Sequence, residues 1–441
     1  MNIAMVKPNL QLGTDGSTIT PPEYKRTEVG VIPEGWEICT LGKMGQFKNG
    51  INKGKQDFGH GFPFVNLMDV FGFPKVSKMA KLGLVNSSVE EQQAYGLQSG
   101  DVIFVRSSVK PEGVGLTTLI IEDLPNTVFS GFLIRYRSHD KLAFEFKEHC
   151  FWESGFRNRL VASSTVSANT NINQEALKPL KIAFPSSKYE QRAIAEALSD
   201  VDKLIEALEK LIAKKRAIKK AAMQQLLTGK TRLPGFSGEW RSCTLGDLGT
   251  FSKGRGIKRD DVSDDGVACI RYGELYTRYY DYIITPVSRI SFLVASTALQ
   301  IKTGDLLFAG SGETAEEIGR CAAYIGEEEV YAGGDIIVLT LTGQNSLYLG
   351  HLMNYETVAA QKARLGQGDA VVHINSRNMA QVKIELPPIA EQNAIATVLS
   401  DMDVELAALE RRREKTKQIK QGMMQELLTG RIRLVKPEAA A

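Results

Sequence analysis

Two stretches of this chain carry apolar residues at alternating spacings of four and three, the heptad pattern of a coiled-coil helix. The pattern runs through Ile194, Leu198, Val201, Ile205 and Leu208, and again, 201 residues later, through Ile395, Leu399, Met402, Leu406 and Leu409. It predicts two helices of about 38 residues, each about 57 Å long at 1.5 Å per residue. A long helix with a narrow apolar stripe needs a partner, so we expect the two to pack antiparallel around a pseudo-two-fold axis.

The ends of both helices are marked in the sequence. Pro185 and Pro387 precede the two starts, and Gly229 and Gly430 follow the two ends, as helix start and stop rules expect. The alternative is an ordinary helical hairpin inside one compact domain. The basic runs at 214–216, 219–220 and 411–413 could contact phosphates or a partner protein, and the alternative for them is a solvated helix face.

The rest of the chain is also repeated. Trp36 and the Cys-Thr-Leu-Gly at 39–42 return as Trp240 and 243–246, 204 residues later, whereas residues 51–99 and 255–303 share almost nothing. A period near 200 residues is a duplicated domain plus helix. The expected parts are a flexible tail (1–20), two globular domains (21–188 and 236–388), the first helix with its linker (189–235), the second helix (389–433) and a C-terminal tail (434–441).

Short apolar segments bounded by turn residues fill both globular blocks. The segments at 102–105 and 306–309 each follow a Gly-Asp turn and predict buried strands, and 64–67 and 269–272 form another strand-like pair. Asn173 and Asn375 are expected to cap or turn the chain. The predicted fold class is α+β: two similar mixed α/β domains separated by two long helices in an antiparallel coiled coil.

Composition and charge narrow the class of protein. Of 441 residues, 43% are hydrophobic and 24% charged, as in an ordinary globular protein, and no apolar run approaches the roughly 20 residues that span a bilayer. Five cysteines without a C-x-x-C pair argue against a disulfide framework and a zinc site. We expect a cytoplasmic protein. The net charge is +3, and residues 236–389 carry −5, so charge alone does not indicate a DNA-coating role.

Motifs for catalysis are missing from the sequence. The Gly-Lys-Thr at 229–231 lacks the upstream glycine of a phosphate-binding loop, and neither a methyltransferase nor a nuclease signature is found. No metal site is expected, because the histidines lack metal-ligand spacing. None shows an equivalent in the other copy, so we expect surface or structural roles for them. The histidines are His60, His139, His149, His351 and His373.

Taken in order and seen twice, the repeated motifs resemble those of type I restriction–modification specificity subunits. They include Gly-x-Ile-Pro-x-x-Trp at 30–36, the Gly-Asp strand at 100–104, Ile172-Asn173, the Glu-Gln helix start at 190–191 and the Leu-Leu-Thr-Gly exit at 226–229. The resemblance covers about residues 21–434. It implies two target-recognition domains, each reading one half of a split, asymmetric DNA sequence. The two helices would set the half-site spacing and dock the modification subunits.

The resemblance also implies partners and places the chemistry on them. Two modification subunits would carry S-adenosylmethionine and methylate adenine, and restriction subunits would use ATP and Mg²⁺. This chain would bind double-stranded DNA, no membrane and no cofactor of its own. The rival functions are a stand-alone DNA-modifying enzyme, which would act without partners, and a DNA-independent scaffold, whose complex would retain no specific duplex.

Candidate DNA contacts are cations in glycine-rich or polar stretches, and the alternative for each one is a solvated surface cation. The candidates are Lys48, Lys53, Lys55, Arg106, Arg157 and Arg159 in the first domain, and Lys253, Arg255, Lys258, Arg259, Arg271, Arg278, Tyr279 and Arg364 in the second. The cluster from Lys253 to Arg259 is the strongest, because four cations fall within seven residues beside two glycines.

Overall fold

The chain divides into two compact units that do not follow the sequence repeat. The computed structural model describes residues 4–6, 23–368 and 371–435, so most of the tail expected at 1–20 and residues 436–441 lie outside the described residues. One unit is formed by residues 1–208 with 412–441, and the other by residues 209–411. Each unit therefore contains one globular domain, the first half of the helix that follows it and the second half of the other helix.

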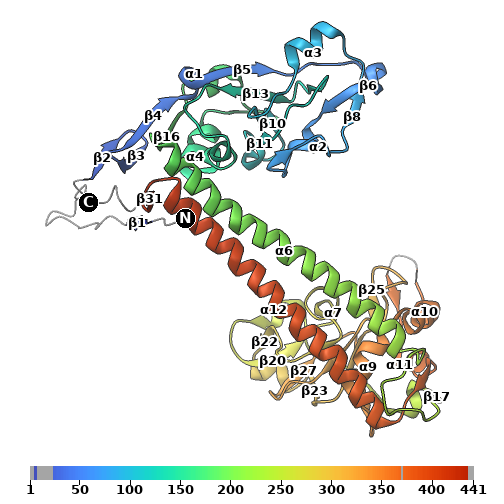
Figure 1. Cartoon of the computed structure of the whole chain (residues 1–441). Coiled ribbons are helices and arrows are strands. Elements are labelled where there is room, and N and C mark those ends of the chain that lie inside the picture. The colour runs from blue at the N-terminus through green and yellow to red at the C-terminus, as the bar shows by residue number, and fades with distance from the viewer. Residues whose placement is uncertain (1–3, 7–22, 369–370, 436–441) are drawn as a thin grey trace, which may run out of the picture. The chain divides into compact units, whose positions relative to one another are not determined.

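The two predicted helices are present and equal in length. Helix α6 spans Lys188–Leu226 and α12 spans Ile389–Leu427, 39 residues each (Figure 1). Both end before a glycine in the left-handed conformation, Gly229 at φ 65° and Gly430 at φ 71°, which glycine adopts without steric penalty. The prediction from the proline and glycine positions is confirmed.

Within each unit the two helix segments pack against each other in opposite directions. In the first unit Lys420 Nζ lies 2.6 Å from Asp202 Oδ1, and in the second the equivalent Lys219 Nζ lies 2.5 Å from Asp403 Oδ1. Lys215 and Arg216, from the first basic run, pair with Glu405 and Glu410 of α12. These two cations of the run therefore bind the neighbouring helix instead of being free in solvent.

The heptad residues are buried most deeply at the start of each helix. Ile194 and Leu198 belong to the core of the first domain, and Ile395 and Leu399 to that of the second. The remaining positions are buried or half-buried: Val201, Ile205, Leu208, Met402, Leu406 and Leu409. The C-terminal ends of the helices are also covered by a domain, because Leu226 and Leu227 pack in the core of the second domain and Leu427 and Leu428 in that of the first.

The Glu-Gln motif that repeats at the start of each long helix makes the same contacts in both units. Arg433, beyond the end of α12, donates from Nε and Nη2 to Glu190 at 3.1 and 2.8 Å. The second unit repeats this fork between Arg232, beyond α6, and Glu391. The glutamine that follows, Gln191 or Gln392, donates to the carbonyl of Pro185 or Pro387 and fixes the turn into the helix.

Both domains contain the same five-stranded sheet. Strands β9 (Val102–Val105) and β24 (Leu306–Ala309) lie at the centres of the two sheets and are completely buried, as predicted. In the first domain the strand order is β5 (Gly45–Asn49), β13 (Leu133–Ser138), β9, β11 (Thr117–Ile120) and β7 (Lys75–Val76). In the second domain it is β18 (Gly249–Lys253), β28 (Ile336–Leu341), β24, β26 (Cys321–Tyr324) and β21 (Tyr282–Ile283).

A second sheet differs between the domains. The first has three strands, β12 (Val128–Phe129), β6 (Phe58–Val65) and β8 (Gly83–Val85). The second has three equivalent strands in the same order, β27 (Val330–Ala332), β20 (Val267–Ile270) and β22 (Ser288–Ile290). It has two more at its edges, β23 (Leu299–Ile301) beside β27 and β19 (Val262–Ser263) beside β22. Most of this sheet lies in the stretches whose sequences diverge, so the divergence changes strand number as well as side chains.

Further strand pairs and short helices complete each domain. In the first domain they are β2 (Tyr24–Thr27), β3 (Gly30–Pro33), β4 (Trp36–Thr40), β10 (Ser107–Ser108), β14 (Thr165–Val166), β15 (Thr170–Asn171), β16 (Lys181–Pro185), α1 (Leu41–Met44), α2 (Leu67–Val70), α3 (Val89–Tyr95), α4 (Ser154–Ala162) and α5 (Gln174–Leu177). In the second they are β17 (Arg241–Thr244), β25 (Ser311–Gly312), β29 (Val372–His373), β30 (Lys383–Leu386), α7 (Glu274–Thr277), α8 (Phe292–Ala295), α9 (Ser346–Met353), α10 (Glu356–Leu365) and α11 (Ser376–Met379). Strand β1 (Ala4–Val6) pairs with β31 (Arg433–Val435).

Asn173 and Asn375 are helix caps, as expected from their repeated positions. Asn173 Oδ1 accepts from the Ala176 N–H and Asn375 Oδ1 from the Asn378 N–H, each at 2.9 Å. We expect Asn173→Ala or Asn375→Ala to lower the free energy of unfolding by about 1 kcal/mol, because one backbone donor of the short helix loses its acceptor. Urea denaturation measures this loss. The matched Asn→Asp variants, which keep the acceptor, should retain most of the stability, and equal losses in both would contradict a capping role.

Candidate nucleic-acid interface

One hollow of about 820 Å³ in the second domain collects four of the predicted cations. Lys258, Arg259, Arg271 and Arg278 all line it, together with the exposed ring of Tyr272. In the described part of the chain Lys258, Arg259 and Arg278 form no ion pair, whereas Arg271 pairs with Glu274. Asp335 lies at the edge of the hollow, 3.7 Å from Lys253. Three cations without a neutralising carboxylate are suited to binding phosphates.

Glycines bring the segment of Lys258 and Arg259 beside the end of β20. A Cβ on Gly254 would lie 2.0 Å from the Gly333 carbonyl, so only glycine permits this approach of the backbones. Gly256 has φ 77°, a conformation that side-chain-bearing residues rarely adopt. Gly333 in turn donates its N–H to Ile270, at the end of β20, at 2.9 Å. The hollow is therefore built by close backbone contacts that a linear sequence does not display.

Arg271 is paired with a buried carboxylate of the hollow. Its Nε and Nη2 donate to Oε1 of the buried Glu274 at 3.0 and 2.8 Å. The same Oε1 accepts from Ser288 Oγ at 2.5 Å, and Oε2 accepts from the Arg271 N–H at 3.0 Å. Sequence reasoning singled out Arg271 but missed Glu274 and Ser288, although an Arg-x-x-Glu spacing at a strand end is a visible signal.

The other candidates of the second domain lie outside the hollow. Lys253, Arg255 and Arg364 are exposed. Tyr279 lies in the core, where its hydroxyl accepts from the Val287 N–H at 2.8 Å and burial raises its pKa to about 12. The neighbouring Tyr280 is 78% exposed, so Tyr280 presents the aromatic ring that sequence reasoning assigned to Tyr279.

In the first domain the structure brings two of the candidate lysines to α3. Lys48 Nζ lies 4.6 Å from the ring centroid of Tyr95, and Lys53 Nζ lies 2.7 Å from Glu91. Lys55 is exposed beside them in sequence. The structure gives Lys53 a carboxylate partner, which weakens its attraction for phosphate.

The three candidate arginines of the first domain bind backbone carbonyls. Arg106 donates to Gly131, Arg157 to Glu112 and Val114, and Arg159 to Lys181. Burial lowers the pKa of Arg157, as expected for a guanidinium away from water. These arginines hold the fold together, and Arg159 also lines a separate pocket.

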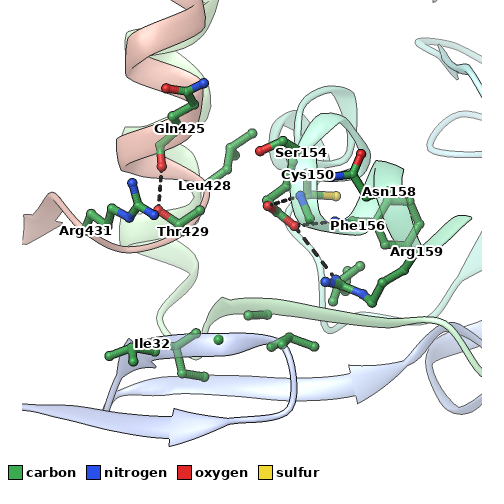
Figure 2. Close-up of a pocket in the computed structure, with 17 residues that line it drawn as sticks. Ile32, Cys150, Ser154, Phe156, Asn158, Arg159, Gln425, Leu428, Thr429 and Arg431 are labelled. Carbon is green, nitrogen blue, oxygen red and sulfur yellow. Dashed lines mark hydrogen bonds and ion pairs between the residues drawn. The ribbon is translucent and has the colours of Figure 1, made fainter. Parts of the chain in front are cut away.

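That pocket, of about 460 Å³, lies between α4, β16 and the end of α12 within the first unit (Figure 2). Glu153 already occupies the start of α4, where its carboxylate accepts from the Gly155 and Phe156 N–H groups at 2.5 and 2.6 Å. Burial raises the pKa of the Cys150 thiol, so that thiol is a poor nucleophile. Neither Cys150 nor the start of α4 therefore offers an activated nucleophile or a vacant anion site.

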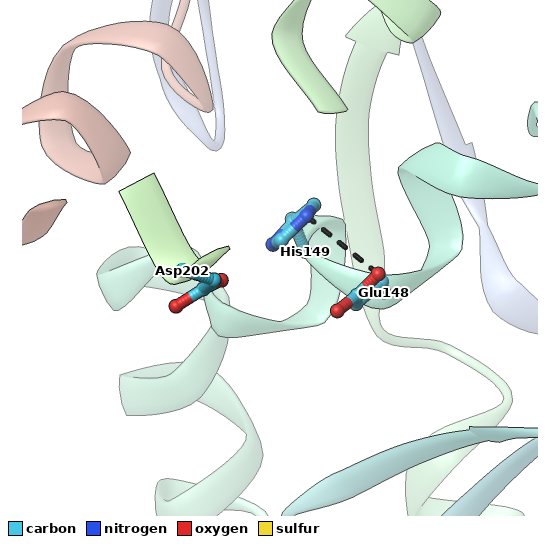
Figure 3. A group of neighbouring side chains, drawn as sticks. All are labelled: Glu148, His149 and Asp202. Carbon is cyan, nitrogen blue, oxygen red and sulfur yellow. Dashed lines mark ion pairs between the residues drawn. The ribbon is translucent and has the colours of Figure 1, made fainter. Parts of the chain in front are cut away.

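Three side chains of the first unit gather with the spacing of metal ligands: Glu148, His149 and Asp202 (Figure 3). Each carboxylate already has a lysine, Lys75 at 2.9 Å from Glu148 and Lys420 at 2.6 Å from Asp202. Burial and these two lysines lower the pKa of His149 to about 3, so the imidazole is neutral near pH 7. A metal ion at this cluster would compete with both ammonium groups for the carboxylates.

The second unit holds a related cluster, which corrects one expectation. His351 Nδ1 lies 2.8 Å from Asp281 and its Nε2 lies 4.0 Å from Asp403, the residue equivalent to Asp202. His149 and His351 are therefore equivalent, and the prediction that no histidine has an equivalent in the other copy is wrong. Their flanking residues differ completely, so only the shared aspartate–lysine pair of the helices reveals the match.

Comparison with known proteins identifies the family to which the two repeated halves of the sequence are similar. The type I restriction modification DNA specificity domain matches the sequence twice, at residues 33–217 and 237–421. Together the two matches cover most of the chain.

The chain belongs to the type I restriction–modification specificity family.

Relatives of this family resemble the chain over most of its length. A candidate specificity subunit of the type I restriction enzyme MjaX from Methanocaldococcus jannaschii is 26% identical, over 93% of this chain and 97% of that protein. The MjaVIII specificity subunit of the same organism is 21% identical over 70% of this chain and 75% of that protein. The predicted family resemblance is confirmed.

Solved structures of the family share the fold. The type I restriction–modification S subunit of M. genitalium superposes with a TM-score of 0.56 at 16% identity, covering 96% of this chain and 99% of that one. A solved structure that concerns complex assembly and conformational transition of the type I R-M system also superposes with a TM-score of 0.56, at 18% identity. It covers 91% of this chain and 99% of that one. The predicted architecture of two specificity domains and two packed helices is confirmed. No helix of residues 4–6, 23–368 and 371–435 is long and apolar enough to cross a membrane.

Proposed function

We propose that this chain selects the DNA target of a type I restriction–modification complex, and that each specificity domain reads one half of a bipartite, asymmetric sequence. The observation that carries the proposal is the cationic hollow of the second domain, placed on the sheet that differs most between the two copies. A shared frame with different side chains around the reading surface is what two unlike half-sites require.

The two helices are proposed to set the half-site spacing and to dock two modification subunits. Their equal length and their continuation from one unit into the other support a fixed spacer. Methylation of adenine is assigned to the modification subunits with S-adenosylmethionine, and ATP- and Mg²⁺-dependent cleavage to restriction subunits. This chain would contribute recognition and no catalytic group.

A genome-wide map of N6-methyladenine tests the proposal. Cells carrying the modification subunits are compared with and without this chain, and a split motif should be methylated only when the chain is present. The two halves should differ in sequence, because the two domains differ. If the modification subunits methylate the same sites with and without the chain, the proposed function is wrong.

A further inference from the structure

Glu274 is a buried carboxylate whose hydrogen bonds keep Arg271 in one orientation. Only 5% of Glu274 is exposed, and burying a charge is unfavourable unless it is paired and hydrogen-bonded. Four donors meet that need: Nε and Nη2 of Arg271, the Arg271 N–H and Ser288 Oγ. The result is an arginine whose guanidinium plane is fixed before any ligand binds.

The guanidinium keeps one edge available to a ligand. Arginine has five N–H donors in a planar fork, and Glu274 engages only the edge formed by Nε and Nη2. Within the described residues the Nη1 group has no protein partner, and the side chain is 32% exposed along the wall of the hollow. The Nη1–Nη2 end is thus free to donate two parallel hydrogen bonds.

Two acceptors side by side are what guanine displays in the major groove. Its O6 and N7 accept a bidentate arginine, the commonest specific contact between side chains and DNA bases. An arginine held by a buried carboxylate is suited to this task. Lys258, Arg259 and Arg278, which line the same hollow and form no ion pair within the described residues, are suited to phosphates.

The equivalent position in the first domain carries a different polar residue. The Val65 carbonyl, which ends β6, accepts from the Ser130 N–H at 3.0 Å, just as the Ile270 carbonyl accepts from Gly333. The next residue is Asn66, whose N–H donates to Asp69 at 2.8 Å, as the Arg271 N–H does to Glu274. The backbone arrangement is conserved between the copies while the exposed side chain changes.

We propose that Arg271 reads a guanine in the half-site bound by the second specificity domain, with Glu274 as the residue that positions it. This inference rests on the proposed function.

The test measures methylation of a duplex panel by the purified complex of this chain with its modification subunits. Each duplex carries one substituted base pair of the wild-type motif. Arg271→Ala is combined with Glu274→Gln so that no unpaired buried carboxylate remains. In this double variant the discrimination against other base pairs at one G·C position should fall roughly 5- to 150-fold. All other positions should keep their discrimination. Arg271→Lys, which retains the charge beside Glu274, should lose discrimination at the same pair, and Glu274→Gln alone should lose less.

Arg289→Ala is the matched control, because Arg289 pairs with Glu328 and does not line the hollow. Its motif should match the wild type. Equal weakening at every position in the Arg271 variants, no change, or a change at a pair other than G·C would overturn the inference while leaving the proposed function standing. If the wild-type complex shows no sequence preference on the panel, the proposed function itself fails. Should the double variant misfold and lose all methylation, the position-specific result for Arg271→Lys decides.

Discussion

Replacing Lys258, Arg259 and Arg278 together with glutamine should weaken binding of the target duplex on the order of 100-fold at about 0.1 M salt. The three cations line one hollow and form no ion pair within the described residues, so each is free to neutralise a phosphate. Every phosphate contact releases counterions and contributes about 0.9 to the slope of log K against log salt. The variant complex should therefore show a slope shallower by about 2.7.

A charge-matched control separates a local contact from a general loss of positive charge. Lys302, Arg377 and Lys383 are exposed on the same domain and none of them lines the hollow. Replacing these three with glutamine should leave both affinity and salt slope close to wild type. Equal effects in the two triple variants, measured by titrating labelled duplex at several salt concentrations, would remove the hollow from the interface.

Arg433→Ala should lower the free energy of unfolding of the first unit by about 3 kcal/mol, because it leaves Glu190 charged and unpaired. Glu190 is 2% exposed, and within the described residues its carboxylate accepts side-chain hydrogen bonds from Arg433 alone. The expected loss lies at the lower end for a broken buried pair, since the arginine side chain is 23% exposed. Hydrogen exchange should show the loss in residues of the first unit and not in residues 209–411.

Two further variants sharpen this prediction. Arg433→Ala with Glu190→Gln removes the stranded charge and should recover part of the stability. Arg431→Ala, two residues earlier, loses only an exposed ion pair at 3.9 Å from Glu426 and should change stability by less than about 1 kcal/mol. If Arg431→Ala is as damaging as Arg433→Ala, the buried fork is not what stabilises this end of the unit.

The helices and the central strands could be predicted from the sequence because their signals are local. Heptad spacing and terminal glycines define α6 and α12, and a Gly-Asp turn before an apolar run defines β9 and β24. Strands β19 and β23 were not predicted, since they have two and three residues in a divergent stretch. Such short strands are specified by their neighbours in the sheet and leave little periodicity to read.

The candidate site was predictable only in part, for a related reason. Lys258 and Arg259 stand out as a local run of charge, but their meeting with Arg278 depends on backbone contacts between distant segments. Arg157 looks like a surface cation in sequence, yet its partners are carbonyls 43 and 45 residues earlier. Tyr279 and Tyr280 are adjacent residues of the same type, so the sequence does not show which ring lies in the core and which is exposed.

The composition of the two units bears on the order in which they are completed during synthesis. Residues 209–411 are contiguous, so the second unit has all its residues once Arg411 has been made. The first unit still lacks Leu427 and Leu428, which pack in the core around Trp36, and the Gly430 carbonyl that accepts from the Tyr24 hydroxyl 406 residues earlier. The domain translated first is therefore completed last. A polypeptide that ends before residue 412 lacks the residues that α12 contributes to the core of this domain.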